Sequence, residues 1–419
     1  MIVFKFGGAS VKNADAVRNL ANIIRKYAGE KLVIVVSAMG KTTNALEKLF
    51  ELAYLQQPYQ KEFEQVKNFH LEILHELFPE PDARVFEEVE EEFGHLQQAL
   101  KLPFQDRYDY GYDQCISFGE IISTRIVSAY LNKCGNANQW TDIRKYLKTD
   151  STFREGQVNW KLSAKLFKQV FDFTATSMYV VQGFIGSDEE NNTTTLGREG
   201  SDYTASIISY ILNAEKVVIW KDVPGVLNAD PKYFEDTVKI DQLSYLDAIE
   251  LAYYGASIIH PKTIKPLQNK NIPLQVKSFI QPDEPGTMIG DINYDMAIPM
   301  FIFKQDQVLM RISATDFSFI AEEKLKGIFT CFARHKIKIN LMQNSAISFQ
   351  VCINDAPLRM VQLVDDLKHD FKVTYETGLE LITIRHYDDS TIERMMRNKE
   401  LILEQKSQRN VQLVAKAMG

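Results

Sequence analysis

Short apolar segments alternate with an amphipathic one at the start of the chain. The runs I-V-F-K-F at 2–6 and L-V-I-V-V at 32–36 have the length of buried strands, and residues 14–28 between them have the spacing of an amphipathic helix. Fully apolar strands separated by helices are typical of a parallel sheet that is covered on both faces. The pattern therefore predicts an α/β fold with a parallel-rich open sheet sandwiched by helices.

Later segments extend this pattern. Residues 43–100 have helical periodicity, and their acidic stretch at 87–92 is expected to form a solvated helical face. Strand-like runs at 178–184 and 216–220 are each followed by a polar loop that contains glycine. Open α/β sheets bind ligands beyond the carboxyl ends of their strands, so these loops are where we expect a site.

The pattern changes after a segment rich in proline and glycine at 281–287. A β-α-β-β-α-β order over 303–376 predicts a small α+β module of the ferredoxin-like kind, and residues 377–419 begin the same order but stop short of a final strand. We therefore predict a catalytic domain at 1–297, a module at 303–376 and a partial second module at 377–419. An incomplete sheet would leave a strand edge that another element or another chain must cover.

Composition narrows the classes of partner. A chain of 419 residues with 45% hydrophobic and 25% charged residues is expected to form two or three globular domains. The net charge of -7 argues against nucleic acid or an anionic membrane as the main partner. We find no secretory leader, no membrane-spanning run and no paired cysteine motif among the four cysteines. These features predict a cytoplasmic protein that acts on small molecules.

The first strand carries a lysine, Lys5, and ends on Gly7 and Gly8. One interpretation places Lys5 on the wet face of an edge strand and makes the glycines a simple turn. The other makes a phosphate site, because glycines let backbone amides approach an anion and the lysine adds positive charge. Ser37 directly follows the second strand, so its amide and hydroxyl are expected at the same edge of the sheet.

Three charged residues stand in unusual surroundings. Glu120 lies on the apolar segment I-S-F-G-E-I-I-S, where it needs a cation, either Arg125 or a ligand ammonium group. Arg198 can grip a carboxylate through its two-pronged guanidinium. Asp202 either caps a helix, as Ser201 also could, or orients Lys5 and helps to organise Mg²⁺.

The loop K-D-V-P-G-V-L-N-A-D-P-K at 221–232 follows another predicted strand. Taken alone it predicts turns and nothing more. Beside three other loops of the phosphate-binding type, it becomes a hypothesis for a nucleotide-binding loop that contains Asp222, Asp230 and Lys232.

Six segments in this order resemble the aspartate kinases of the amino acid kinase superfamily, and the resemblance covers essentially the whole chain. The C-terminal modules resemble the ACT domains that bind amino-acid effectors in these enzymes. The six segments are K-F-G-G-A-S-V at 5–11, V-V-S-A-M-G-K-T-T-N at 35–44, S-F-G-E at 117–120, G-R-E-G-S-D-Y-T-A at 197–205, K-D-V-P-G-V-L-N-A-D-P-K at 221–232 and G-A-S-I-I-H-P-K-T-I at 255–264.

The resemblance implies ATP-dependent phosphorylation of the β-carboxylate of L-aspartate to 4-phospho-L-aspartate, the first step of the branch to lysine, threonine and methionine. It implies ATP with Mg²⁺ as cofactor. Lys5 would stabilise the phosphoryl group in transit, with backbone donors at Gly7, Gly8 and Ser37. A carboxylate nucleophile is already ionised at neutral pH, so the reaction needs no general base.

The resemblance also assigns the two substrates. Arg198 would bind the α-carboxylate of aspartate and Glu120 its α-ammonium group, with further contacts from Thr43 and Ser201. Asp202 would orient Lys5. The nucleotide positions are Lys221, Asp222, Asp230, Lys232 and Ser257, and His260 is expected to be structural.

Four residues depart from the usual family pattern. Ala9 and Lys221 stand where threonine is common, Glu199 where glycine is common, and Ser257 where many members carry a lysine that reaches the nucleotide. Asn340 stands where lysine-sensitive relatives often carry an aspartate. Exchange of that carboxylate for an amide removes a charge-assisted bond, so we expect weak or no inhibition by lysine, together with a homodimer formed by the ACT-like region.

Two alternatives stay open at this point. The chain could be another amino acid kinase, acting on glutamate, acetylglutamate, carbamate or a nucleotide. It could also be a catalytically weak, effector-binding regulatory subunit. Retention of Lys5, Arg198 and Asp202 argues against the second, and turnover of ATP with aspartate would distinguish all three.

Overall fold

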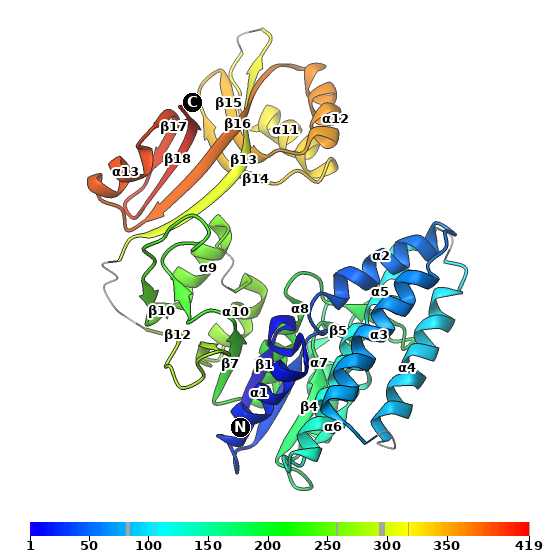
Figure 1. Ribbon diagram of the computed structural model, residues 1–419. Coiled ribbons are helices and arrows are strands. Elements are labelled where there is room, and N and C mark those ends of the chain that lie inside the picture. The colour runs from blue at the N-terminus through cyan, green and yellow to red at the C-terminus, as the bar shows by residue number, and fades with distance from the viewer. Residues whose placement is uncertain (81–83, 105, 257–258, 293–297, 317, 419) are drawn as a thin grey trace. The chain divides into compact units, whose positions relative to one another are not determined.

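Two compact units make up the chain. The computed structural model describes residues 1–80, 84–104, 106–256, 259–292, 298–316 and 318–418. The first unit comprises Met1–Val226, Lys239–Ile249 and Ser257–Asn293, and the second comprises Leu227–Val238, Glu250–Ala256 and Tyr294–Gly419. Each unit contains one large sheet (Figure 1).

An eight-stranded sheet organises the first unit, in the order β10-β12-β11-β7-β1-β2-β4-β3. Every pair of neighbouring strands is parallel except β11 and β12. This confirms the predicted parallel-rich open sheet. The strands are β1 Ile2–Phe6, β2 Leu32–Val36, β3 Gln139–Thr141, β4 Met178–Gln182, β7 Lys216–Lys221, β10 Gln242–Ser244, β11 Leu274–Ser278 and β12 Thr287–Gly290, and the short pairs beside the sheet are β5 Ile185–Ser187 with β6 Thr193–Thr195 and β8 Val226–Leu227 with β9 Lys239–Ile240.

Helices cover both faces of this sheet. Successive side chains of a strand point to opposite faces. Phe4 packs against Tyr27, just beyond α1, whereas Lys5 reaches Asp202 on α8, so α1 and α8 lie on opposite sides of β1. The helices are α1 Ala14–Arg25, α2 Thr42–Tyr54, α3 Gln60–Leu77, α4 Arg84–Leu100, α5 Tyr108–Ile116, α6 Phe118–Lys133, α7 Trp160–Val170, α8 Gly200–Leu212, α9 Tyr245–Tyr254 and α10 Pro261–Gln268.

A six-stranded sheet organises the second unit, in the order β14-β15-β13-β16-β18-β17. Helices α11 and α12 pack on its first half, over a core that contains Met310, Ile328 and Leu363. Its elements are β13 Met300–Ala314, α11 Glu322–Arg334, β14 Ile339–Asn344, β15 Ser348–Asn354, α12 Pro357–Lys368, β16 Phe371–Arg385, α13 Asp389–Met396, β17 Lys399–Lys406 and β18 Asn410–Ala417.

The long strand β13 supplies the strand that the tail lacks. Its first residues, from Met300 to Lys304, pair antiparallel with the end of β16, from Arg385 to Leu381, on the side of β16 opposite β18. That is the place a final strand of the second module would occupy. The strand edge that was expected to need cover is thus covered by another element of the same chain, and among the described residues the sheet ends at β14 and β17. Residue 377 lies inside β16, so the two modules share this strand, and the domain limits stay a prediction.

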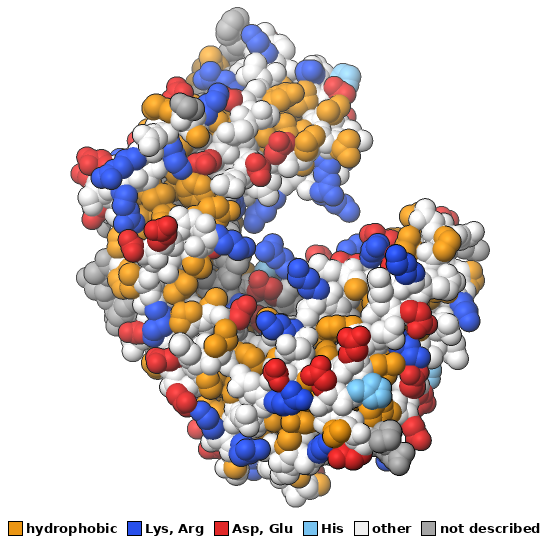
Figure 2. Space-filling view, viewed as in Figure 1, with side chains coloured by type: hydrophobic (Ala, Val, Ile, Leu, Met, Phe, Trp, Pro, Cys, Tyr) orange, Lys and Arg blue, Asp and Glu red, His pale blue; other side chains and the backbone are white. Residues whose placement is uncertain are grey.

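Among the described residues, none of the helices is both long enough and apolar enough to span a membrane. Figure 2 shows basic and acidic side chains interspersed over the face in view. All four cysteines are unpaired, and Cys115 and Cys352 are buried.

Candidate active site

Lys5 and Asp202 form an ion pair beside the carboxyl ends of the strands. The distance between Lys5 Nζ and Asp202 Oδ1 is 2.7 Å, and the two side chains are 11% and 4% exposed. This burial excludes the interpretation in which Lys5 lies on a wet face. Asp202 Oδ1 accepts no aligned hydrogen bond among the described residues, so the contact is an ion pair that leaves the ammonium protons available to a ligand.

Gly7 and Gly8 bring free backbone amides to this lysine. Neither amide donates a hydrogen bond within the described part of the chain. A Cβ on Gly8 would lie 2.7 Å from the carbonyl oxygen of Gly40 and 2.9 Å from that of Ala38, so only glycine fits there. Two unsatisfied amides next to an ammonium group make a site for an anion such as phosphate.

The backbone of Ser37 is already hydrogen-bonded within the protein and is not available to a ligand. Its amide donates to the Phe6 carbonyl oxygen at 3.0 Å, which continues the pairing of β1 with β2, and its carbonyl oxygen accepts from Ser123 Oγ at 2.7 Å. The prediction that the Ser37 amide is a free donor for the phosphoryl group is therefore wrong. Only its hydroxyl group is left for a ligand.

Glu120 is buried on α6 with one carboxylate oxygen unsatisfied. The side chain is 2% exposed; Oε1 accepts from the Ala38 amide at 3.3 Å, and Oε2 has no partner among the described residues. Burial raises the pKa of this carboxyl to about 8, although the Ala38 amide and the charge of Lys5 act in the opposite direction. The carboxyl group is thus placed for a cation that the described residues do not supply.

Arg125 is not the partner of Glu120. Its guanidinium lies 2.9 Å from Glu92 Oε1 and 3.6 Å from Glu88 Oε2, and it stacks over the Trp140 ring. Glu92 is itself buried, so the acidic stretch at 87–92 is not a fully solvated face as expected. Of the two predicted partners for Glu120, a ligand ammonium group is the one left.

The segment before α8 presents Arg198 to solvent. Its guanidinium is exposed and has no partner among the described residues. Glu199 adopts a left-handed backbone with φ 54°, and its carboxylate accepts from the His260 amide at 2.8 Å. A left-handed position favours glycine, which explains why glycine is common here in the family and why Glu199 carries a conformational cost. No side chain caps α8, so the alternative in which Ser201 or Asp202 is a helix cap is wrong.

Comparison with known proteins agrees with this arrangement. A model of the amino acid kinase family matches residues 1–278. Aspartokinase 2, chloroplastic, from Arabidopsis thaliana is 32% identical over 390 residues, which cover 87% of this chain and 69% of the relative. Lysine-sensitive aspartokinase 3 from Escherichia coli is 30% identical over 400 residues, which cover 92% and 86%. The crystal structure of E. coli aspartokinase III in complex with aspartate and ADP (R-state) matches 99% of this chain and 96% of its own, with a TM-score of 0.84 and 26% identity.

The chain belongs to the aspartokinase family. Two further residues, Thr43 and Ser201, were predicted from the sequence to contact the substrate. Thr43 is half-buried in the first turn of α2, which begins just after the loop that packs on Gly8. Ser201 is 8% exposed in the first turn of α8. A Cβ on Gly183 would lie 2.4 Å from Ser201 Cβ, so the glycine after β4 lets α8 approach the sheet edge.

The positions predicted to bind the nucleotide in an aspartokinase are described except for one. Lys221 ends β7, and Asp222 after it is exposed. Asp230 accepts from the Lys232 amide at 2.9 Å, which is the local turn that its sequence predicts. Lys221 and Asp222 belong to the first unit, and Asp230 and Lys232 belong to the second. Ser257 lies outside the described residues.

His260 has the structural role expected of it. Its Nδ1 accepts from the Lys262 amide at 3.1 Å and so caps the N-terminus of α10. Among the described residues, no group of three or more His, Cys, Asp or Glu side chains could hold a metal ion.

Sequence reasoning missed Asp113, a buried carboxyl group on α5. It accepts from the Arg154 amide at 2.9 Å and from both the amide and the hydroxyl group of Thr195 at 2.8 Å. Burial raises its pKa to about 6, against these hydrogen bonds. Because Thr195 ends β6 three residues before Arg198, Asp113 helps to fix the segment that carries the arginine. No helix was predicted over Tyr108–Ile116, so the sequence offered no signal that this carboxyl group is buried.

Asn340 stands at the position where lysine-sensitive relatives often carry an aspartate. In the second unit its side chain is already hydrogen-bonded to neighbouring side chains. Its Oδ1 accepts from Lys304 Nζ at 2.9 Å, and its Nδ2 donates to Gln307 at 2.9 Å and Asn354 at 2.7 Å. Burial and the nearby charge of Lys338 lower the pKa of Lys304 to about 8. The amide of Asn340 is therefore satisfied by the chain itself.

Proposed function

We propose that the Lys5 site transfers the γ-phosphoryl group of ATP to the β-carboxylate of L-aspartate, which yields 4-phospho-L-aspartate and ADP. This is the aspartokinase reaction, the first step of the branch to lysine, threonine and methionine. The observation that carries the proposal is Glu120 Oε2, a buried carboxylate oxygen without a partner among the described residues, in the same site as Lys5 and the two free glycine amides. An amino-acid acceptor needs a place for its ammonium group beside the phosphoryl group, and this site offers both.

Aspartate is held by both of its α-substituents. Glu120 accepts the α-ammonium group, because an ammonium ion supplies the donor that Oε2 lacks. Arg198 binds the α-carboxylate, since its exposed guanidinium has no other described partner and a bidentate pair fixes orientation. Thr43 and Ser201 add hydroxyl contacts from the first turns of α2 and α8. This leaves the β-carboxylate free to attack.

Lys5 stabilises the charge that spreads over the phosphoryl oxygens in the transition state. The amides of Gly7 and Gly8 and the hydroxyl group of Ser37 add hydrogen bonds to the same oxygens. Asp202 is a positioning residue, because its carboxylate lies 2.7 Å from Lys5 Nζ and holds the ammonium at the sheet edge. The nucleophile is ionised at neutral pH, so no general base takes part.

The nucleotide is held after β7. Lys221 and Asp222 come directly at the end of that strand, and we assign Asp230, Lys232 and Ser257 to the same role on the family pattern alone. Mg²⁺ enters with the phosphates and needs only one or two protein carboxylates. The exposed Asp222 fits that requirement, whereas Asp202 could meet it only through its second carboxylate oxygen, because Oδ1 already contacts Lys5 Nζ. Bound Mg²⁺ would neutralise charge on the phosphates.

The sequence predictions about organisation belong to the same proposal. They are a kinase domain at 1–297, an ACT-like domain at 303–376 and a partial second unit at 377–419, assembled as a homodimer or a larger homo-oligomer in the cytoplasm. An amino-acid effector at the ACT-like region is supported by a structure of E. coli aspartokinase III in complex with lysine and aspartate (T-state), which matches this chain with a TM-score of 0.82 at 26% identity.

A substrate panel tests the proposal. ADP release from MgATP is measured with L-aspartate, L-glutamate, N-acetylglutamate, carbamate and UMP as acceptors. We expect turnover with aspartate only. Turnover with another acceptor instead would assign the chain to a different amino acid kinase reaction, and no turnover with any would favour a regulatory subunit.

A further inference from the structure

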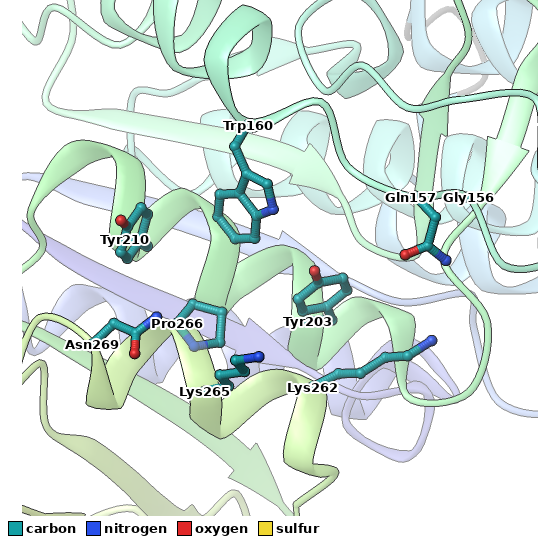
Figure 3. A pocket seen from close by; sticks show the side chains of 9 residues that line it. All are labelled: Gly156, Gln157, Trp160, Tyr203, Tyr210, Lys262, Lys265, Pro266 and Asn269. Atoms are coloured by element: carbon teal, nitrogen blue, oxygen red, sulfur yellow. The ribbon is translucent and has the colours of Figure 1, made fainter.

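A cavity of about 440 Å³ lies in the first unit, and none of the catalytic residues lines it. Its walls come from α7, α8, α10 and the segment before α7, and no residue assigned above to aspartate or ATP lines it. Figure 3 shows the rings of Trp160, Tyr203 and Tyr210 on one side of this hollow and the lysine side chains of α10 on the other. The site is therefore separate from the one described above.

The aromatic side chains form an apolar wall. Trp160 and Tyr210 pack edge to face with ring centroids 5.2 Å apart, and Tyr203 lies two helical turns before Tyr210 on α8. Rings in such an arrangement offer faces and edges to another flat ring. A fully polar ligand would use little of this wall, and an aliphatic one would not gain the edge and face contacts between rings.

Several hydrogen-bond donors that line the cavity have no acceptor among the described residues. Lys262 and Lys265 form no ion pair with any described acidic residue, and no carboxylate lines the cavity. Trp160 Nε1 and Tyr203 Oη make no hydrogen bond within the described residues either. With two lysines and no carboxylate in its lining, the cavity favours an anionic ligand.

We propose that this cavity binds a small anion built on a flat ring, such as an aromatic carboxylate or an aromatic phosphate ester. The ring packs against Trp160, Tyr203 and Tyr210, and the anionic group meets Lys262 and Lys265. This inference goes beyond the aspartokinase activity and does not depend on it, because the two sites share no residue.

The test measures binding with the active site filled. Phenyl phosphate and benzoate are titrated into the full chain in the presence of saturating ADP and aspartate, with calorimetry as the readout. Inorganic phosphate tests the anion without the ring, and benzylamine tests the ring with the opposite charge. We expect a ring-bearing anion to bind at least about tenfold more tightly than phosphate, and benzylamine not to bind.

Variants locate the binding. The double variant Lys262→Ala and Lys265→Ala should weaken the preferred anion at least about tenfold, as loss of charge-assisted hydrogen bonds does. Lys265 is exposed, so Lys265→Glu provides a second variant that should fold and also lose binding. Lys161→Ala is the matched control, because Lys161 is an exposed lysine next to Trp160 that does not line the cavity.

Three outcomes would overturn the proposal. They are binding of the ring anions no tighter than that of phosphate, binding that survives Lys265→Glu unchanged, and an equal loss in the Lys161→Ala control. A preference for phenyl phosphate over benzoate, or the reverse, would identify which anionic group the site takes.

Discussion

Lys5 Nζ lies 2.7 Å from Asp202 Oδ1, which ties the first strand of the chain to the first turn of α8. The ion pair holds an ammonium group beside the free amides of Gly7 and Gly8. A lysine in this position would otherwise sample several rotamers at the edge of the sheet. Asp202 therefore acts on the reaction through Lys5.

Asp202→Asn tests this relationship. The amide keeps the shape of the side chain but removes the charge that orients Lys5, so we expect kcat to fall by about 10-fold to 100-fold, on the scale of a lost charged contact. The KM for aspartate should change little, because Asp202 is not assigned to that substrate. A large rise in that KM with unchanged kcat would place Asp202 on aspartate instead.

Glu120 predicts a pH dependence of aspartate binding. Its pKa is raised to about 8 by burial, so the carboxyl group of the free protein is protonated near neutral pH. Binding the α-ammonium group requires the carboxylate, and a proton must therefore leave. The affinity for aspartate should rise with pH, by up to about tenfold per unit below pH 8, and level off above it. Calorimetry over roughly pH 6 to 9, in two buffers of different ionisation enthalpy, measures both the affinity and the released proton.

Glu120→Gln is the control for that titration, because it should bind aspartate weakly and without this pH dependence.

The raised pKa of Glu120 also has a consequence for the stability of the folded protein. A carboxyl group whose pKa is higher in the folded protein than its ordinary value of 4.5 loses its stabilising contribution as pH rises from there towards 8. Wild type without aspartate should thus lose thermal stability relative to Glu120→Gln over that range. Parallel pH profiles for the two proteins would contradict the assignment.

Arg198→Ala should raise the KM for aspartate strongly while the KM for ATP stays near that of wild type. The exposed guanidinium makes no other described contact, so its removal should not disturb the fold. Loss of a bidentate carboxylate contact corresponds to about 10-fold to 100-fold in KM. Arg18→Ala serves as the control, because it removes a partly exposed arginine on α1 that pairs with Asp15 and donates to the Glu76 carbonyl oxygen. An unchanged aspartate KM would remove Arg198 from the site.

The second unit predicts weak inhibition by lysine. Asn340 offers an amide instead of a carboxylate, and its oxygen already accepts a hydrogen bond from Lys304. An effector ammonium group would have to displace that bond without gaining an opposite charge. Aspartate turnover is measured with lysine, with threonine and with both. Strong inhibition by lysine alone would show that the effector binds elsewhere in this region.

Local pattern was sufficient for the strands and loops that carry the phosphate site. The apolar runs at 2–6 and 32–36 became β1 and β2, and Lys5 with its two glycines lies where the pattern put it. Glu120 was identified because a carboxylate in an apolar helix needs a cation. Arg125 is not this cation, because it pairs with Glu92 on α4. Glu92 lies 33 residues away in the sequence, and a local pattern does not indicate such a pairing.

The tail was harder to predict. Strand β17 was missed because K-E-L-I-L-E-Q-K carries charges at both ends and lies at a sheet edge, where polar side chains are tolerated. The predicted boundary between the modules at 376 and 377 falls inside one continuous strand, β16. The missing final strand is supplied by the first residues of β13, which precede the second module by more than 70 positions in the sequence. Such an exchange is a property of topology rather than of residue pattern.

The measurement that tests the account most directly is formation of aspartyl hydroxamate. Wild type and Lys5→Ala are incubated with MgATP, L-aspartate and hydroxylamine, which traps an acyl phosphate, and Lys12→Ala, an exposed lysine of the same segment, serves as the control. We expect hydroxamate from wild type and from Lys12→Ala, and a loss of about 10²-fold to 10³-fold with Lys5→Ala while the protein stays folded. No hydroxamate from wild type, or activity of Lys5→Ala within about tenfold of it, would contradict a phosphoryl-transfer site built on Lys5.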